Sequence, residues 1–332
     1  MKLNFNVQNP SFTAGKVKLY SDFDGTYFPS SRSTLRKGED VDLMKNYSSK
    51  MDKFFKSTKG DLDFHITTGR DFESFKSVSE FLKEKGLSLP YPQSFITSNG
   101  SCEYIKSIDN TSSDFPFSTK IVNTSKIKGD SKLVDTAKAL ENVLKENDLL
   151  IVAGNSKNDL KMLNPLEYIK QEEWDAFKLK STNKKFYESS MTEKMSMLKD
   201  VYNGKNTELK KQLELDGLLK KIEDLPLRSI VVESDKPEIK MLIDSFENSG
   251  KIIKIAKGDL DSGIKSAVKS YAQKNNSYKN SMSKDFLNVI FQSNSMKTFN
   301  AILLPITGIL LTGFVMAKHY LHPEKKLNKK TA

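Results

Sequence analysis

Two aspartates follow a short apolar segment near the start of the chain. Asp22 and Asp24 lie in SDFDGTYF, directly after the alternating apolar residues of KVKLY. Open α/β sheets build their sites at the carboxyl ends of strands, and a turn at Gly25 can bring both carboxylates towards one centre. Such a pair can do catalytic work, but Asp-Gly is also an ordinary turn, so this segment alone leaves both interpretations open.

Three later segments add polar groups near the ends of further predicted elements. ITTGR offers an anion the hydroxyl of Thr68 and the amide of Gly69, although Thr68 or Asp71 could instead cap the next helix. SKLVDTAKAL places Lys132 near the start of a helix, where a lysine could also simply lie on the surface. VAGNSKNDLKML carries oxygen-bearing side chains suited to a hard cation such as Mg²⁺, namely Asn155, Ser156, Asn158 and Asp159.

Alternating strand and helix patterns must position these groups. Short apolar or period-two segments predict strands at KVKLY, LDFHI, SFITS, LLIVA, SIVVE and KIIKIA. Helical spacing of apolar residues predicts helices over 41–55, 72–86, 133–144, 239–250 and 264–271. This alternation is typical of an α/β fold in which a mostly parallel sheet has helices on both faces.

The charge distribution argues against a nucleic-acid-binding protein. The net charge is +11, but residues 276–332 hold 8 lysines and only 2 acidic residues, so the rest of the chain is mildly basic. Residues 170–227 interrupt the alternation with 12 lysines and 11 acidic residues, which predicts a charged helical insertion with a solvated surface. A single cysteine, Cys102, excludes an internal disulfide framework and a Cys-rich zinc site.

The two ends of the chain carry different signals. We expect residues 1–16 to be a flexible N-terminus without a signal peptide and residues 276–297 to be a linker. Residues 298–317 are uncharged and include AILLPITGILLTGFVMA, which predicts a transmembrane helix, with a buried C-terminal helix as the alternative. The basic tail 318–332 weakly favours a cytoplasmic C-terminus. We nevertheless expect a cytoplasmic catalytic domain, because the body is synthesised before the membrane helix emerges.

Read in order, DFDGT, TTGR, SNGS, SK and GNSKNDLKML resemble the haloacid dehalogenase superfamily, in particular its Cof-like and sucrose-phosphatase-like branch. The resemblance covers about residues 17–274, and we expect a phosphatase domain over residues 17–275. It implies a three-layer Rossmann-like fold and a hydrolase that acts on a small phosphate monoester, such as a sugar phosphate, through an aspartyl phosphate.

The resemblance also implies roles for individual residues. Asp22 would be the nucleophile, and Asp24 would act as general acid and then as general base. The phosphate-binding groups would be Thr68, Gly69 and Lys132. The implied ligands of the Mg²⁺ cofactor are Asp22, Asp24, Asn155 and Asp159.

Two departures from the family pattern matter. Asn155 stands where the family has an aspartate, so we expect weaker binding of Mg²⁺. Only residues 103–131 are available for the cap that this branch inserts, which predicts a reduced cap unless the insertion 170–227 folds over the site. Two alternatives therefore stay open, a membrane-tethered degenerate module that binds phosphate with little turnover, and a phosphomutase.

Overall fold

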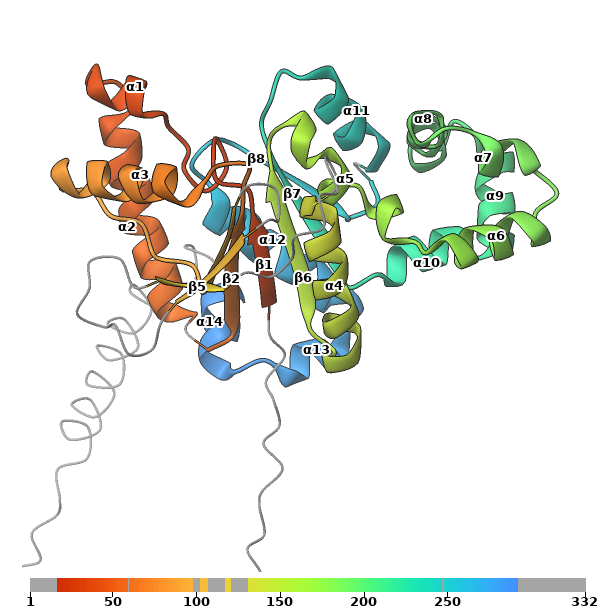
Figure 1. The fold of residues 1–332 in the computed structure, drawn as a ribbon. Coiled ribbons are helices and arrows are strands. Elements are labelled where there is room, and N and C mark those ends of the chain that lie inside the picture. Colours follow the sequence, from red (N-terminus) through yellow and green to blue (C-terminus); the bar gives the residue numbers. More distant parts are fainter. Residues whose placement is uncertain are drawn as a thin grey trace, which may run out of the picture. The chain divides into compact units, whose positions relative to one another are not determined.

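The computed structural model describes residues 17–58, 60–97, 102–106, 117–120, 131–246 and 248–291. Its centre is an eight-stranded sheet in the order β5-β4-β3-β2-β1-β6-β7-β8 (Figure 1). The strands are β1 (Val17–Ser21), β2 (Leu62–Thr67), β3 (Ser94–Thr97), β4 (Cys102–Lys106), β5 (Phe117–Lys120), β6 (Leu149–Gly154), β7 (Leu227–Val232) and β8 (Ile252–Ile255). Neighbouring strands in the part β3-β2-β1-β6-β7-β8 run parallel, and β4 pairs antiparallel with both β3 and β5. The predicted α/β fold with a mostly parallel sheet is confirmed.

Aromatic contacts place two helices on one face of this sheet. The rings of Phe55 in α2 (Val41–Ser57) and Phe64 in β2 lie 4.9 Å apart. The rings of Phe75 in α3 (Phe72–Glu84) and Phe95 in β3 lie 3.8 Å apart. Phe64 and Phe95 point to the same face, because Phe95 pairs with Ile66, which lies two residues beyond Phe64. Helices α2 and α3 therefore cover this face, where α12 (Leu260–Lys274) also contacts α2.

The opposite face carries α4 (Ser131–Glu146), α5 (Leu160–Leu163) and α11 (Pro237–Phe246), where α5 contacts both α4 and α11 (Figure 1). Strand β6 lies between the two helical layers, and all six of its residues are buried. An apolar segment without alternation is expected for such a strand, because neither of its faces meets water.

The charged insertion forms helices beside this second layer. They are α6 (Gln171–Lys180), α7 (Lys184–Glu188), α8 (Met191–Tyr202), α9 (Thr207–Asp216) and α10 (Leu218–Asp224). Helix α8 packs on α11, where Lys199 Nζ lies 2.7 Å from Asp244 Oδ2. Leu198 of α8 and Leu242 of α11 are fully buried in one apolar cluster. Ion pairs between lysines and acidic side chains of the insertion lie mainly at the surface.

Residues 276–297 were predicted as a linker, but residues 276–291 are largely helical. They form α13 (Asn276–Ser281) and α14 (Lys284–Phe291). Tyr278, Met282, Phe286 and Ile290 are buried. Tyr278 lies in α13, and Phe286 and Ile290 lie in α14, so each short helix buries an apolar side against the α/β body. The hydroxyl of Ser283 donates to Asp61 Oδ2 at 2.8 Å and fixes the connection between them.

The membrane prediction falls outside the described residues, as do residues 1–16 and the tail 318–332. Among the residues that the structure describes, no helix is both long and apolar enough to cross a membrane. Attachment through residues 298–317 therefore stays a prediction.

A buried lysine makes the stability of the fold depend on pH. Lys251 is 1% exposed, and its Nζ donates to the carbonyl oxygens of Glu223 at 2.8 Å and Leu225 at 2.6 Å. Burial, followed by the positive charges of Arg228 and Lys274, lowers the pKa of Lys251 to about 6. Between pH 6 and the ordinary lysine pKa of about 10.4, the unfolded chain therefore binds more protons than the folded one. The free energy of unfolding should rise with pH across this window.

We expect Lys251→Met to flatten this rise. The parent should gain about 1 kcal/mol of unfolding free energy per pH unit relative to the variant between pH 6.5 and 8.5. Urea denaturation at three pH values measures the difference, and Lys254→Met is the control, because Lys254 is an exposed lysine of β8, the strand that begins directly after Lys251. Equal pH dependence in parent and Lys251→Met would show that Lys251 stays charged in the fold.

Candidate active site

The carboxyl ends of neighbouring parallel strands meet at one pocket with a volume of about 460 Å³. Its lining residues are Asp22, Asp24, Thr68, Gly69, Arg70, Lys132, Asn155, Ser156, Asn158, Glu233, Ser234 and Lys236. Six of the seven residues predicted from the sequence are among them. The seventh, Asp159, is 0% exposed and contacts Lys132 from behind the wall. The structure thus brings the whole predicted set together.

Lys132 joins two buried carboxylates. It lies in the first turn of α4, and its Nζ is 2.7 Å from Asp22 Oδ1 and 2.6 Å from Asp159 Oδ1. Burial, together with the charge of Asp159, raises the pKa of Asp22 to about 7 although Lys132 opposes this shift. Burial lowers the pKa of Lys132, but the two carboxylates outweigh it and the net shift is upwards. Lys132 is therefore a buried cation and not a surface lysine.

Asp159 organises the turn that follows β6. Its Oδ2 accepts hydrogen bonds from the backbone N–H groups of Asn155 at 3.1 Å and Ser156 at 2.9 Å, and from Ser156 Oγ at 2.8 Å. A Cβ on Gly154 would lie only 2.6 Å from Asp159 Cβ, so this close approach requires glycine. Both carboxylate oxygens of Asp159 are thus engaged in holding the turn and Lys132.

The turn after β1 carries the two predicted catalytic aspartates. The N–H of Asp22 donates to Ala153 O of β6 at 2.8 Å, which continues the ladder between the two strands. Gly25 has a φ of 74°, and a Cβ there would lie 2.0 Å from Asn155 Nδ2. The Asp-Gly segment is therefore both a tight turn and part of the pocket wall, and Asn155 packs directly against it.

Thr68 is not the cap of the following helix. The N-cap of α3 is Asp71, whose side chain accepts from the N–H of Ser74 at 2.7 Å. The hydroxyl oxygen of Thr68 accepts from the N–H of Arg70 at 3.2 Å. Because that oxygen is already an acceptor, the hydroxyl proton of Thr68 can be donated to an anion in the pocket.

Arg70 is a site residue that the sequence reasoning missed. Its Nε lies 2.5 Å from Asp24 Oδ2 and its Nη2 lies 2.7 Å from Asp24 Oδ1, so the two side chains form a two-pronged ion pair. Its Nη1 donates to Ser74 Oγ at 2.8 Å. The hydrogen bond to Asp24 raises the pKa of Arg70. Its position directly after Gly69 could have marked Arg70 as a site residue. Ser234 and Lys236 also line the pocket, but they follow β7, where the sequence has no recognisable motif.

The donors at the pocket suit a hard cation only in part. Within the described ranges, no three Asp, Glu, His or Cys side chains converge on a point that could hold a metal ion. Asp22, one oxygen of which accepts from Lys132, and Asn155 line the wall, and their side chains carry the oxygen donors that Mg²⁺ prefers. The carboxylate of Asp24 is bound by Arg70. The carboxylate of Asp159 is bound by Lys132 and by N–H groups of the turn after β6. The residues therefore fit a Mg²⁺ held by Asp22, Asn155 and water, with little ligand charge.

Comparisons with known proteins give little further support. No family model matches the sequence. No curated protein matches it either. Among solved structures, the chain is similar to yhjK, a haloacid dehalogenase-like hydrolase protein from Bacillus subtilis, with 19% identity over 46% of this chain and 73% of that chain and a TM-score of 0.29. At that TM-score the likeness carries no argument, so fold and chemistry rest on the residues described above.

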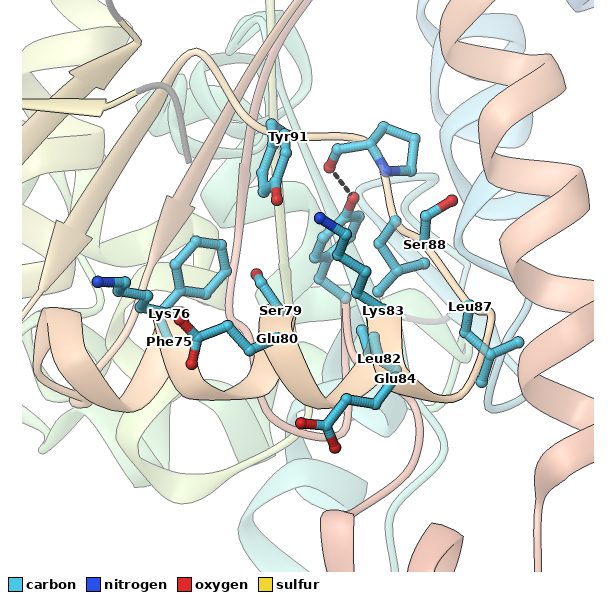
Figure 2. Close-up of a pocket in the computed structure, with 13 residues that line it drawn as sticks. Phe75, Lys76, Ser79, Glu80, Leu82, Lys83, Glu84, Leu87, Ser88 and Tyr91 are labelled. Carbon is cyan, nitrogen blue, oxygen red and sulfur yellow. Dashed lines mark hydrogen bonds between the residues drawn. The ribbon is translucent and has the colours of Figure 1, made fainter. Parts of the chain in front are cut away.

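A larger pocket, of about 850 Å³, lies between α3 and residues 87–91 (Figure 2). Apolar side chains such as Phe75 and Leu82 line it together with lysines and glutamates of α3. The hydroxyl of Tyr27 donates to the carbonyl oxygen of Pro90 in its wall, a hydrogen bond drawn in Figure 2. None of the residues predicted to act in catalysis lines this pocket, so the smaller one remains the candidate active site.

The insertion does not line the candidate site. No residue of the described helices α6 to α10 is among those that line it. The segment 103–131, where a reduced cap is predicted, contributes β5 and most of β4 to the sheet edge, and its residues 107–116 and 121–130 lie outside the described residues.

Proposed function

We propose that the protein is a haloacid dehalogenase-type phosphatase that hydrolyses a phosphate monoester through an aspartyl phosphate on Asp22, with Mg²⁺ as cofactor. The observation that supports this most is the bridge of Lys132 between Asp22 and Asp159, with Thr68 in the same pocket. A buried ammonium beside a carboxylate at a strand end is suited to hold phosphoryl oxygens next to a nucleophile.

The reaction then has two steps. A carboxylate oxygen of Asp22 forms a bond to phosphorus, the ester P–O bond breaks, and Asp24 gives a proton to the leaving oxygen. Water next attacks the phosphorus of the aspartyl phosphate, Asp24 takes a proton from that water, and inorganic phosphate leaves. Lys132 and the Thr68 hydroxyl hold the phosphoryl oxygens in both steps. A bound Mg²⁺ supplies positive charge that offsets repulsion between carboxylate and phosphate.

The lining of the pocket indicates the kind of leaving group. No aliphatic or aromatic side chain of the described residues lines it. A hydroxylated leaving group, such as a sugar, suits these hydrogen-bonding groups better than an aromatic or lipid one. Release of inorganic phosphate by the full-length protein, from a panel of sugar phosphates and p-nitrophenyl phosphate with Mg²⁺, tests the proposal.

We expect Asn155→Asp to lower the Mg²⁺ concentration that gives the half-maximal rate. The substitution adds a negative charge at a wall position where an oxygen ligand is available, and ligand charge raises the affinity of a site for hard cations. Ser234→Asp adds the same charge to the same pocket at a position with no predicted metal role and is the matched control. A Mg²⁺ titration of the three forms that shows no shift specific to Asn155→Asp would exclude position 155 as a metal ligand.

Asn155 also supports a second candidate function, that of a module which binds phosphate without hydrolysing a substrate. With Asn155 in place of a carboxylate and Asp24 held by Arg70, the pocket has few carboxylates available for a metal. A membrane-tethered module that binds phosphate without turnover would have these properties. Phosphate binding by the parent without phosphate release from any substrate of the panel, at any Mg²⁺ concentration, would favour it.

A further inference from the structure

Asp24 cannot act as general acid while it is held as the structure shows. Both of its carboxylate oxygens accept hydrogen bonds from Arg70, at 2.5 Å and 2.7 Å. A leaving-group oxygen needs one of these oxygens for proton transfer. The ion pair is accessible, because the side chains of Arg70 and Asp24 are 36% and 46% exposed. An incoming ligand can therefore reach it.

We propose that Arg70 exchanges partners when substrate binds, leaving Asp24 for an oxygen of the phosphoryl group and so releasing Asp24 for proton transfer. This inference rests on the proposed phosphatase function and adds a phosphate-binding residue and a gate to the same site. Substrate binding then frees the Asp24 carboxylate, which takes up a proton from solvent water before it gives that proton to the leaving oxygen, so Asp24 is available only when a phosphate is present.

The geometry of Arg70 suits such an exchange. The two parallel N–H donors that hold the carboxylate of Asp24 match two phosphate oxygens equally well. The backbone N–H of Arg70 donates to the hydroxyl oxygen of Thr68, so the side chain of Arg70 starts beside a predicted phosphate-binding group. Arg70, Thr68 and Lys132 line the same pocket. A phosphate dianion carries more charge than Asp24 and competes effectively for a half-exposed arginine.

A double-mutant cycle with inorganic phosphate as the probe tests the exchange. Dissociation constants for phosphate are measured by calorimetry with the full-length parent, Arg70→Gln, Asp24→Asn and the double variant, at one Mg²⁺ concentration. If Arg70 binds phosphate, Asp24→Asn alone tightens binding, because the arginine has no competing partner. Arg70→Gln then weakens binding roughly tenfold to a hundredfold in the Asp24→Asn background, and by less where Asp24 is present.

A purely structural role for Arg70 gives the opposite pattern. Arg70→Gln would then weaken phosphate binding only where Asp24 is present, by exposing its charge, and would have less than about a twofold effect in the Asp24→Asn background. That result would overturn the proposed exchange of partners but would leave the proposed phosphatase function untouched. Absence of phosphate binding in all four forms would contradict the proposed function as well.

Two further variants test whether the change in phosphate affinity is caused by the two-pronged contact of Arg70 and not by misfolding or by the loss of one positive charge. Arg70→Lys keeps the charge but loses the two-pronged contact, so an intermediate loss of affinity is expected in the Asp24→Asn background. Lys157→Gln removes one exposed positive charge from the neighbouring loop without touching Asp24. A loss in Lys157→Gln as large as that in Arg70→Gln would show that only net charge matters, and would overturn the inference.

Discussion

Asp22→Asn is expected to reduce kcat by a factor on the order of 10⁴ or more, because an amide cannot form the acyl phosphate. The fold should survive, since the asparagine has nearly the same volume and Lys132 keeps Asp159 as a partner. The pKa of Asp22 is raised in the fold, so its ionisation costs stability as pH rises from about 4 to about 7. The variant should therefore be at least as stable as the parent at pH 8.

Rates of phosphate release and urea denaturation at pH 8 measure both effects. Asp71→Asn is the matched control, because Asp71 caps α3 next to the pocket and an asparagine caps a helix equally well. We expect parental turnover in that control. An Asp22→Asn protein that is folded and hydrolyses phosphate esters at the parental rate would rule out Asp22 as the nucleophile.

Lys132→Met is expected to remove turnover and to lower the free energy of unfolding by about 3–5 kcal/mol at pH 8, because it leaves Asp22 and Asp159 buried without their common cation. The loss of stability should shrink as the pH falls, since a protonated Asp22 does not need the ammonium. It should also shrink in the double variant Lys132→Met, Asp22→Asn, which has one fewer unpaired carboxylate.

The denaturation midpoints of these four forms decide whether Lys132 is a structural centre of the site. A loss below about 1 kcal/mol in Lys132→Met, which is the value of an exposed ion pair, would mean that water reaches the cluster and that the ammonium is not sequestered. Strictly additive effects of the two substitutions would show that Lys132 and Asp22 do not interact.

The six core strands could be predicted because each is a short apolar segment that alternates along the chain with a helix-period pattern. The contacts of Phe64 with α2 and of Phe95 with α3 could not be predicted, since they depend on the order of the strands in the sheet. Strands β4 and β5 were missed because they lie in a segment rich in Ser, Thr and Asp. Helices α13 and α14 were missed because abundant Asn, Ser and Lys concealed the four-residue spacing from Tyr278 to Ile290.

The site could be predicted where residue type and strand ends coincide, as for Asp22, Thr68 and Asn155. Two properties required coordinates. The family resemblance implies that Asp159 is a metal ligand, but its oxygens hold the turn and Lys132. No role was predicted for Arg70, which holds Asp24 from 46 positions along the chain. Pairings of this kind follow from the three-dimensional arrangement of loops, which local sequence patterns do not encode.

The central claim is that Asp22 becomes phosphorylated, and trapping the intermediate tests it most directly. The full-length protein is mixed with Mg²⁺ and its best substrate, quenched in acid within one turnover, and digested for mass spectrometry. The account predicts one added phosphoryl group on the peptide that contains Asp22, removable by hydroxylamine and absent from Asp22→Asn. Turnover of substrate with no phosphorylated peptide, or with the phosphoryl group on another residue, would contradict it.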